Sequence, residues 1–301
     1  MMLVERLAAA RGGAAVGPVE ERGILRLAGK GARDFLHRMS TQHLSALPAD
    51  GSAYAAFLEP KGHILGEGLV VARPDDLLLL TEPGEVPVLL PHLRKYLLAA
   101  PVKIDDVSGE ICAMAVLGPL GVEQATGVEG ATVAATPRRG VKGVEVIGPS
   151  GVLSALRERL LAGGASDLSA ADLEVLRIEE GVARFGVDMD GARLPMEAGL
   201  TRDAIHFQKG CYPGQEVVAR ATFRGHIQRG LVQLELPAGA GPGTPLSSGG
   251  VEVGQVASAA DTTQGRLGLG YLRRALWREG ERLTTPAGDA IVRRVLVSEP
   301  G

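Results

Sequence analysis

Cysteine and aromatic residues are scarce in this chain of 301 residues, which has two cysteines, one tryptophan and 3% aromatic residues. The two cysteines, Cys112 and Cys211, form no C-x-x-C motif, so they predict no disulfide framework. An iron–sulfur cluster takes about four cysteine ligands, which this chain cannot supply by itself. With so few rings, the hydrophobic core must be built from Leu, Val and Ala.

Strong net charge and long apolar runs are also missing. The formal charge is −3, so we expect no broad basic surface and no direct binding of nucleic acid. No apolar run approaches the roughly 18 residues of a membrane span. The N-terminal segment contains acidic residues and no continuous hydrophobic stretch, so we expect a short helix or a frayed arm there and not a targeting segment. These absences predict a cytoplasmic protein without membrane contact.

The first part of the chain alternates between strand and helix signals, and its length allows two domains or three small ones. A helix is expected after the turn at residues 29–31, with Phe35, Leu36 and Met39 on its apolar face, and a second at residues 86–98, kinked at Pro91. Alternation and short apolar runs predict strands at residues 23–28, 52–58, 64–71, 77–80, 102–107 and 111–117. This order indicates a ferredoxin-like α+β unit.

The rest of the chain changes character at about residue 229. Residues 118–148 are rich in glycine and give no clear signal, and residues 152–161 predict a helix. Ser169 and Asp172 are spaced like a capping box, which predicts a helix that ends at Gly181. Short strands with glycine-rich turns follow, at residues 231–236, 251–258, 267–272 and 291–297. We therefore expect an α/β region at residues 1–228 and a small antiparallel β-barrel at residues 229–301.

The most informative stretch is Lys209–Arg220, KGCYPGQEVVAR. We interpret it as a turn that opens a short helix, with Pro213 in the first helical turn and residues 217–219 on the buried face. We expect Cys211 to be exposed, just before this helix and beside Lys209, an environment that favours the thiolate. The residues alone leave Cys211 as a structural thiol, a reactive thiolate or one ligand of a shared metal centre.

This stretch, with Phe223-Arg224-Gly225 after it, resembles the signature of the YgfZ family of folate-binding proteins, which are related to the glycine cleavage T-protein. Three further segments fit the family in order and spacing: PKGH at 60–63, RIEEG at 177–181 and LPMEA at 194–198. The resemblance implies two intertwined α/β subdomains that bind tetrahydrofolate or a one-carbon derivative, followed by a β-barrel. It also implies an accessory role in the maturation or repair of iron–sulfur proteins, with effects on tRNA modification, and iron–sulfur proteins or assembly factors as partners.

The resemblance assigns roles to individual residues. Cys211 becomes the functional thiol, and its loop is shaped by Lys209, Gln215 and Glu216. Glu179 becomes the carboxylate that accepts two hydrogen bonds from a pterin; the alternative is a solvated residue paired with Arg177 or Arg184. Arg177 is also expected at the folate site, with a surface ion pair of little energetic value as the alternative. Contacts to the anionic folate tail would come from Lys61, Arg224 and Arg229, and simple solvation is the alternative for each.

Other functions remain open at this point. The T-protein carries an aspartate in its N-terminal hairpin, whereas residues 62–67 here read GHILGE, and only Glu67 could substitute. A folate-dependent aminomethyltransferase or methyltransferase is therefore the second hypothesis, and a folate-free scaffold is the third. A cysteine hydrolase that pairs Cys211 with His206 or His226 is disfavoured because no third orienting residue stands out. A zinc site made of the same three residues is disfavoured by their spacing, and we predict no resident metal. Cys112, in an apolar run, is expected in the core.

Overall fold

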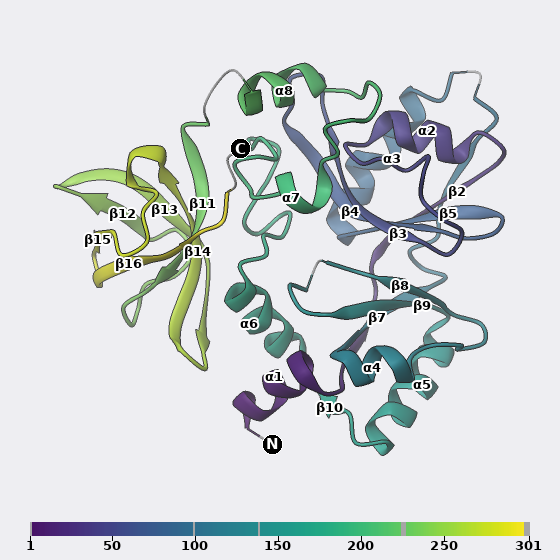
Figure 1. Ribbon diagram of the computed structural model, residues 1–301, viewed down its shortest axis with the longest axis horizontal. Coiled ribbons are helices and arrows are strands. Elements are labelled where there is room, and N and C mark those ends of the chain that lie inside the picture. The colour runs from purple at the N-terminus through teal and green to yellow at the C-terminus, as the bar shows by residue number, and fades with distance from the viewer. Residues whose placement is uncertain (1, 99, 138, 224–226, 298–301) are drawn as a thin grey trace. The chain divides into compact units, whose positions relative to one another are not determined.

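The computed structural model describes residues 2–98, 100–137, 139–223 and 227–297 (Figure 1). The chain forms two compact units. The first consists of Met1–Leu58, Leu65–Leu173 and Asp203–Pro213, and the second of Glu59–Ile64, Glu174–Arg202 and Gly214–Gly301. Both units are therefore assembled from separate stretches of the chain. The division at residue 229 remains a proposal, although the first barrel strand does begin at Arg229.

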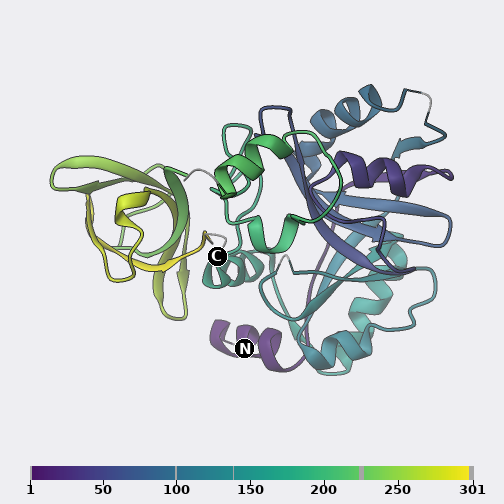
Figure 2. The same ribbon diagram turned by 45° about the horizontal axis from the view of Figure 1, so that its top comes forward.

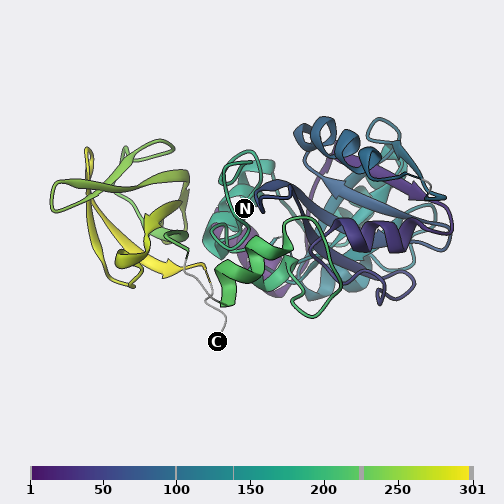
Figure 3. The same cartoon turned by 90° about the horizontal axis from the view of Figure 1, so that it is seen from above.

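A five-stranded antiparallel sheet lies in the first unit, with strand order β3-β4-β5-β2-β6. Its strands are β2 (Gly23–Ala28), β3 (Ser52–Leu58), β4 (Ile64–Ala72), β5 (Asp76–Thr81) and β6 (Lys103–Asp106). Two helices, α2 (Ala32–Met39) and α3 (Val86–Lys95), cover one face, because Phe35, Leu36 and Leu89 belong to the same buried cluster as Leu25 and Phe57. Figure 3 shows both helices on this sheet. The expected apolar face of the first helix is confirmed.

A second five-stranded sheet packs against the free face of the first. Its strand order is β10-β1-β7-β9-β8, and Ile147 from this sheet shares a cluster with Ile24, Leu69 and Leu78 from the other. Residues of α5 cover its outer side, where Leu153 and Leu156 are buried. The elements of this half are α1 (Leu3–Gly12), β1 (Ala15–Glu20), β7 (Cys112–Leu117), α4 (Pro119–Gln124), β8 (Thr132–Ala135), β9 (Gly143–Gly148), α5 (Ser150–Ala162) and β10 (Ser166–Asp167).

Helix α6 (Ala170–Glu180) carries the chain from the first unit into the second. Its start is the expected capping box: the Ser169 hydroxyl accepts from the Asp172 N–H at 3.1 Å, and the Asp172 carboxylate accepts from the Ser169 N–H at 2.8 Å. Arg6 of α1 also binds the Asp172 carboxylate, with Nη2 2.7 Å from Oδ1. Gly181, with φ of +75°, ends the helix. This helix was correctly predicted at both ends.

The second unit contains a closed six-stranded barrel, with order β11-β14-β13-β12-β15-β16, seen along its opening in Figure 2. Its core is aliphatic, with Val232, Leu234, Leu246 and Leu272 buried. The strands are β11 (Arg229–Glu235), β12 (Pro245–Ser248), β13 (Val251–Thr262), β14 (Gly265–Arg273), β15 (Arg282–Thr285) and β16 (Gly288–Val295). Closure leaves no unpaired sheet edge. The expected fold class, α+β with a C-terminal antiparallel barrel, is confirmed.

Three local expectations were wrong or incomplete. Residues 118–148, which gave no signal, contain α4, β8 and β9. Pro213 lies in a turn and not in a helix, because Gly214 follows it with φ of +81° and α8 begins only at the next residue (Gln215–Phe223). Only Val218 of the expected buried face is fully buried. The short elements that complete the chain are η1 (Pro83–Glu85), α7 (Thr201–Ala204) and η2 (Arg274–Leu276).

Candidate functional site

Lys209 fastens the Cys211 loop to helix α2 in the first unit. Its side chain is only 7% exposed, and its ammonium donates to the carbonyl oxygens of His37 and Ser40, the latter at 2.6 Å. The same nitrogen lies 5.0 Å from the centre of the Tyr212 ring. Burial lowers the pKa of Lys209 from its ordinary value of 10.5 to about 8. Lys209 therefore acts on the loop as an anchor, with its donors directed at backbone oxygens.

Cys211 is exposed and lies at a cavity of about 300 Å³. Helix α2 contributes Phe35, Arg38 and Met39 to the lining, α3 ends beside it at Tyr96, and the loop itself contributes Tyr212 and Pro213. The sequence predicted the exposed thiol, but it gave no sign that Phe35 and Tyr96, from distant segments, would join the neighbouring Tyr212 around it. The thiolate form of Cys211 stays a prediction.

The other cysteine is placed quite differently. Cys112 begins β7 and packs half-buried against the cluster that contains Met114 and Leu153. Burial, followed by the nearby Glu21 carboxylate, raises the pKa of its thiol. A raised pKa keeps the thiol protonated and unreactive, so the structural interpretation of Cys112 holds.

A histidine cluster beside the Lys209 anchor was not anticipated from the sequence. The His43 ring lies 5.0 Å from His37 and 5.1 Å from His206, measured between ring centres. His37 Nδ1 accepts from the N–H groups of Leu44 and Ser45. Burial, then the Lys209 and His43 charges, lower the pKa of His37, so this ring is neutral at pH 7. No group of three or more His, Cys, Asp or Glu among the described residues could hold a metal ion.

Two of the sequence motifs meet in the second unit. A Cβ on Gly214 would lie 2.7 Å from the Glu59 oxygen and 2.9 Å from the Gly62 Cα, and a Cβ on Gly62 would lie 2.9 Å from the Val217 Cβ. Both glycines have positive φ, so glycine is required at each for space and for conformation. The turn that carries Lys61 is thus packed against the start of α8. Lys61 and Glu216 are exposed, and Gln215 is half-buried.

Glu179 lies in the last turn of α6 and is 8% exposed. Its Oε1 accepts from the hydroxyl and the N–H of Thr263, at 2.9 and 3.2 Å. The solvated position considered for Glu179 is therefore wrong, because the carboxylate is buried. Arg177 and Arg184, the partners considered for it, both bind Glu174. The structure therefore places a buried carboxylate at Glu179, and its role in binding a ligand stays a prediction.

Arg177 occupies the centre of a buried polar network. Its guanidinium binds Glu174 at 2.5 Å, Asp188 at 2.6 Å and the Ser258 hydroxyl at 3.2 Å. Burial acts to lower the pKa of Arg177, but Glu174 and Asp188 raise it above its usual range. The guanidinium joins α6 to the 182–190 loop and to β13, a role that the sequence did not reveal, because Asp188 carries no motif of its own.

The remaining predicted residues are distributed as follows. Arg229 is exposed at the start of β11, and Arg224 lies outside the described residues. Cys211 and Lys209 belong to the first unit, whereas the second contains Lys61, Arg177, Glu179, Gln215, Glu216 and Arg229. Among the helices described, none has the length and apolar character needed to cross a membrane.

Comparisons with known proteins show the family of this chain. Residues 3–135 match the family model described as the GCVT N-terminal domain. The mouse mitochondrial iron–sulfur cluster assembly factor IBA57 is 30% identical over 85% of this chain and 76% of its own length. An aminomethyltransferase of Rubrobacter xylanophilus is 28% identical over 84% of this chain and 74% of its own length.

The fold has a close counterpart among solved structures. Aminomethyltransferase T of the Bartonella henselae glycine cleavage system superposes with a TM-score of 0.85 at 19% identity, over 99% of this chain and 90% of that one. The chain therefore has an aminomethyltransferase-like fold and belongs to the GCVT-domain family, together with the IBA57 and aminomethyltransferase relatives.

Proposed function

We propose that the protein is a tetrahydrofolate-binding accessory factor that maintains iron–sulfur proteins, with Cys211 as its functional thiol. The observation that carries the proposal is the exposure of Cys211 on a loop that Lys209 fastens to α2, at the edge of a cavity. Such a thiol can reach a partner, which the role requires, since one cysteine cannot hold a cluster alone. The likeness to the IBA57 assembly factor supports the choice of partner class.

Folate binding is the second part of this proposal. A pterin presents an N–H and an amino group side by side, and a carboxylate can accept both. Glu179 fits this requirement, because it is a carboxylate kept from bulk water, where a charge-assisted hydrogen bond is strong. We propose Lys61, Arg224 and Arg229 as contacts to the anionic tail. Arg177 fits a supporting role, since its donors are already directed at Glu174 and Asp188.

Aminomethyl transfer is the second candidate, because aminomethyltransferases are among the relatives. The hairpin segment at residues 62–67 has no aspartate, and its single acidic residue, Glu67, is fully buried. The Glu67 N–H donates to the buried Glu85 carboxylate at 2.6 Å, which fixes the local backbone. These facts favour the accessory role. A one-carbon transfer assay separates the two candidates, since only a transferase turns over.

The two cysteines provide a matched pair of variants for the main test. Cys211→Ala should abolish the rescue of iron–sulfur enzyme activity in cells that lack the endogenous factor. The affinity for tetrahydrofolate should change by no more than about twofold, which corresponds to less free energy than one hydrogen bond contributes. Cys112→Ala removes the half-buried thiol and should keep the rescue. Full rescue by Cys211→Ala at equal protein level would reject the thiol as the functional group.

A further inference from the structure

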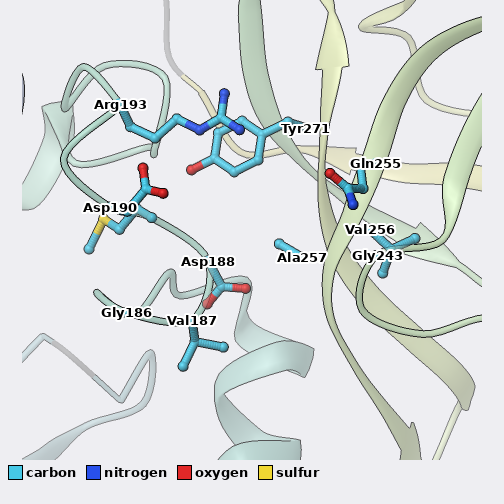
Figure 4. A pocket seen from close by; sticks show the side chains of 11 residues that line it. Gly186, Val187, Asp188, Asp190, Arg193, Gly243, Gln255, Val256, Ala257 and Tyr271 are labelled. Carbon is cyan, nitrogen blue, oxygen red and sulfur yellow. The ribbon is translucent and has the colours of Figure 1, made fainter.

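A second cavity, of about 280 Å³, lies in the second unit between the 186–193 loop and the barrel strands β13 and β14 (Figure 4). None of the residues proposed above for the thiol or for folate lines it. Its polar wall contains Asp188, Asp190, Arg193, Gln255 and Tyr271, and its apolar wall contains Val187, Met189, Val256 and Ala257. Small-molecule sites combine such an apolar lining with a few directed polar groups.

Tyr271 places an unsatisfied donor in this cavity. The residue is 5% exposed, and its buried hydroxyl has no hydrogen-bond partner within the part of the chain that the structure describes. Figure 4 shows the hydroxyl directed toward Asp190, with the Arg193 side chain lying along the ring. Burial raises the pKa of Tyr271, so the group remains a donor at neutral pH. An unpaired buried hydroxyl destabilises the protein by about 1–3 kcal/mol, and an acceptor on a ligand would relieve this.

Arg193 contributes the cation of the site. Its Cζ lies 4.0 Å from the centre of the Tyr271 ring, so the guanidinium stacks on the ring and is held in one orientation. Among the described residues no carboxylate forms an ion pair with it. A stacked guanidinium keeps its N–H edge available, and that edge matches a carboxylate in a two-bond arrangement.

Asp190 contributes the anion of the site. The other aspartate, Asp188, already accepts from Arg177 at 2.6 Å and from the Ser258 hydroxyl at 2.5 Å. Asp190 is exposed, and within the described residues its Oδ1 accepts only from the Ala192 N–H, at 2.9 Å. The cavity therefore presents one available cation and one available anion. A ligand with a single charge would leave one of them unpaired, whereas a zwitterion satisfies both.

We propose that this cavity binds a small zwitterion, an α-amino acid, with its carboxylate on Arg193 and the Tyr271 hydroxyl and its ammonium on Asp190. The Gln255 amide and the apolar wall then face the amino-acid side chain. The volume accommodates an amino acid and is smaller than typical pockets for drug-sized molecules, which are roughly 300–1,000 Å³. The proposal goes beyond the folate and thiol chemistry and does not depend on it.

Isothermal titration of the full chain with each of the twenty amino acids, and with propionate and ethylamine, tests the proposal. At least one amino acid should bind, and the analogues that lack one charge should bind at least about tenfold more weakly, as expected for a lost charged hydrogen bond. Absence of binding by every amino acid at about 10 mM, an affinity too weak to be specific, overturns the proposal. If propionate or ethylamine binds as tightly as the best amino acid, the claim that the ligand is a zwitterion is overturned.

Variants then locate the bound molecule. Tyr271→Phe removes only the hydroxyl and should weaken binding about tenfold, and Asp190→Asn and Arg193→Gln should weaken it at least as much. Asp289→Asn and Arg282→Gln, on exposed barrel residues outside the cavity, are matched controls. Binding that none of the three cavity variants changes would place the ligand elsewhere and overturn the site. Circular dichroism confirms that each variant is folded.

Discussion

At the scale of single residues, the buried ammonium of Lys209 makes stability depend on pH. Its pKa is about 8 in the folded protein and 10.5 ordinarily. Between these values the unfolded chain holds a proton that the folded chain has released, so the free energy of unfolding rises with pH across this window. This gain is present above pH 10.5 and is lost as the pH falls to 8. We expect a gain on the order of 3 kcal/mol in wild type and none in Lys209→Met.

Urea denaturation at intervals between pH 8 and 10.5 measures this gain. The comparison between wild type and Lys209→Met matters, because burial raises the pKa of Tyr212 to about 12 and this tyrosine makes stability fall above pH 10 in both proteins. Lys103→Met, at a side chain that is 76% exposed, is the control and should keep the wild-type slope. An identical slope in Lys209→Met would show that the ammonium is not desolvated.

The Arg177–Asp188 pair gives a second prediction at this scale. The Asp188 side chain is fully buried, so Asp188→Asn leaves the Arg177 charge without its buried counterion and should destabilise the protein by about 3–5 kcal/mol. The control is Asp261→Asn, which breaks an ion pair with Arg266 whose aspartate is 82% exposed, and it should change stability by less than about 1 kcal/mol. Chemical denaturation measures both. Similar losses would mean that the buried network contributes no more than a surface pair.

For single residues, the sequence indicated which side chains carry the chemistry more readily than which partners those side chains contact. The turn residues around Cys211 correctly indicated an exposed thiol. The partners of Arg177 and the contact of Glu179 with Thr263 could not be predicted, because Asp188, Ser258 and Thr263 lie in loops and strands that only folding brings to α6. A single sequence records no such distant pairing.

At the scale of elements, the start of helix α6 depends on a local signal, the capping box of Ser169 and Asp172. Ser169→Ala removes the hydroxyl that caps the Asp172 N–H and should destabilise the protein by about 1 kcal/mol. Ser154→Ala, on an exposed position of α5, is the matched control and should be neutral or slightly stabilising, since alanine favours a helix interior. Denaturation midpoints compare the two. A neutral Ser169→Ala would mean that Asp172 and Arg6 fix the helix start without the hydroxyl.

Helices and strands were predictable where the hydrophobic periodicity agreed with flanking glycine or proline residues, and not elsewhere. Helix α2 and strands β2 and β3 follow from their apolar period and flanking glycines. Strand β10 has only two residues, and it pairs in parallel with β1 through Ala15 and Ser166, a contact between distant segments that no local pattern records. Gly214 explains the error at Pro213: a positive φ between proline and helix makes a turn out of what looked like a helix start.

At the scale of the whole molecule, each unit is built from segments that the chain supplies in alternation. The second unit takes the Glu59–Ile64 turn from the middle of one hairpin and Glu174–Arg202 from the middle of the chain, as well as the barrel. The sequence predicted the barrel because its short strands and glycine turns are contiguous. Composition alone could not predict the interleaving, since it does not change where the chain passes from one unit to the other within α6.

Folate binding is best tested on the whole molecule, because any ligand that binds only the folded chain stabilises it. Tetrahydrofolate at about 100 times its dissociation constant should add about 2.7 kcal/mol to the free energy of unfolding and raise the melting temperature. Glu179→Gln keeps an oxygen that accepts from Thr263 but loses the charge, so the fold should survive while the affinity falls by about ten- to a hundredfold, as for a lost charged hydrogen bond.

Glu235→Gln, at a barrel side chain that is 53% exposed, is the matched control and should respond to tetrahydrofolate as wild type does. Three outcomes separate the hypotheses, with the melting temperature as the measurement. A shift of wild-type size in Glu235→Gln and of about half that size or less in Glu179→Gln supports folate recognition by the buried carboxylate. Equal shifts in all three place the pterin away from Glu179. Without a shift in wild type at saturating ligand, the protein is a folate-free scaffold, and the exposed thiol must act on its partners alone.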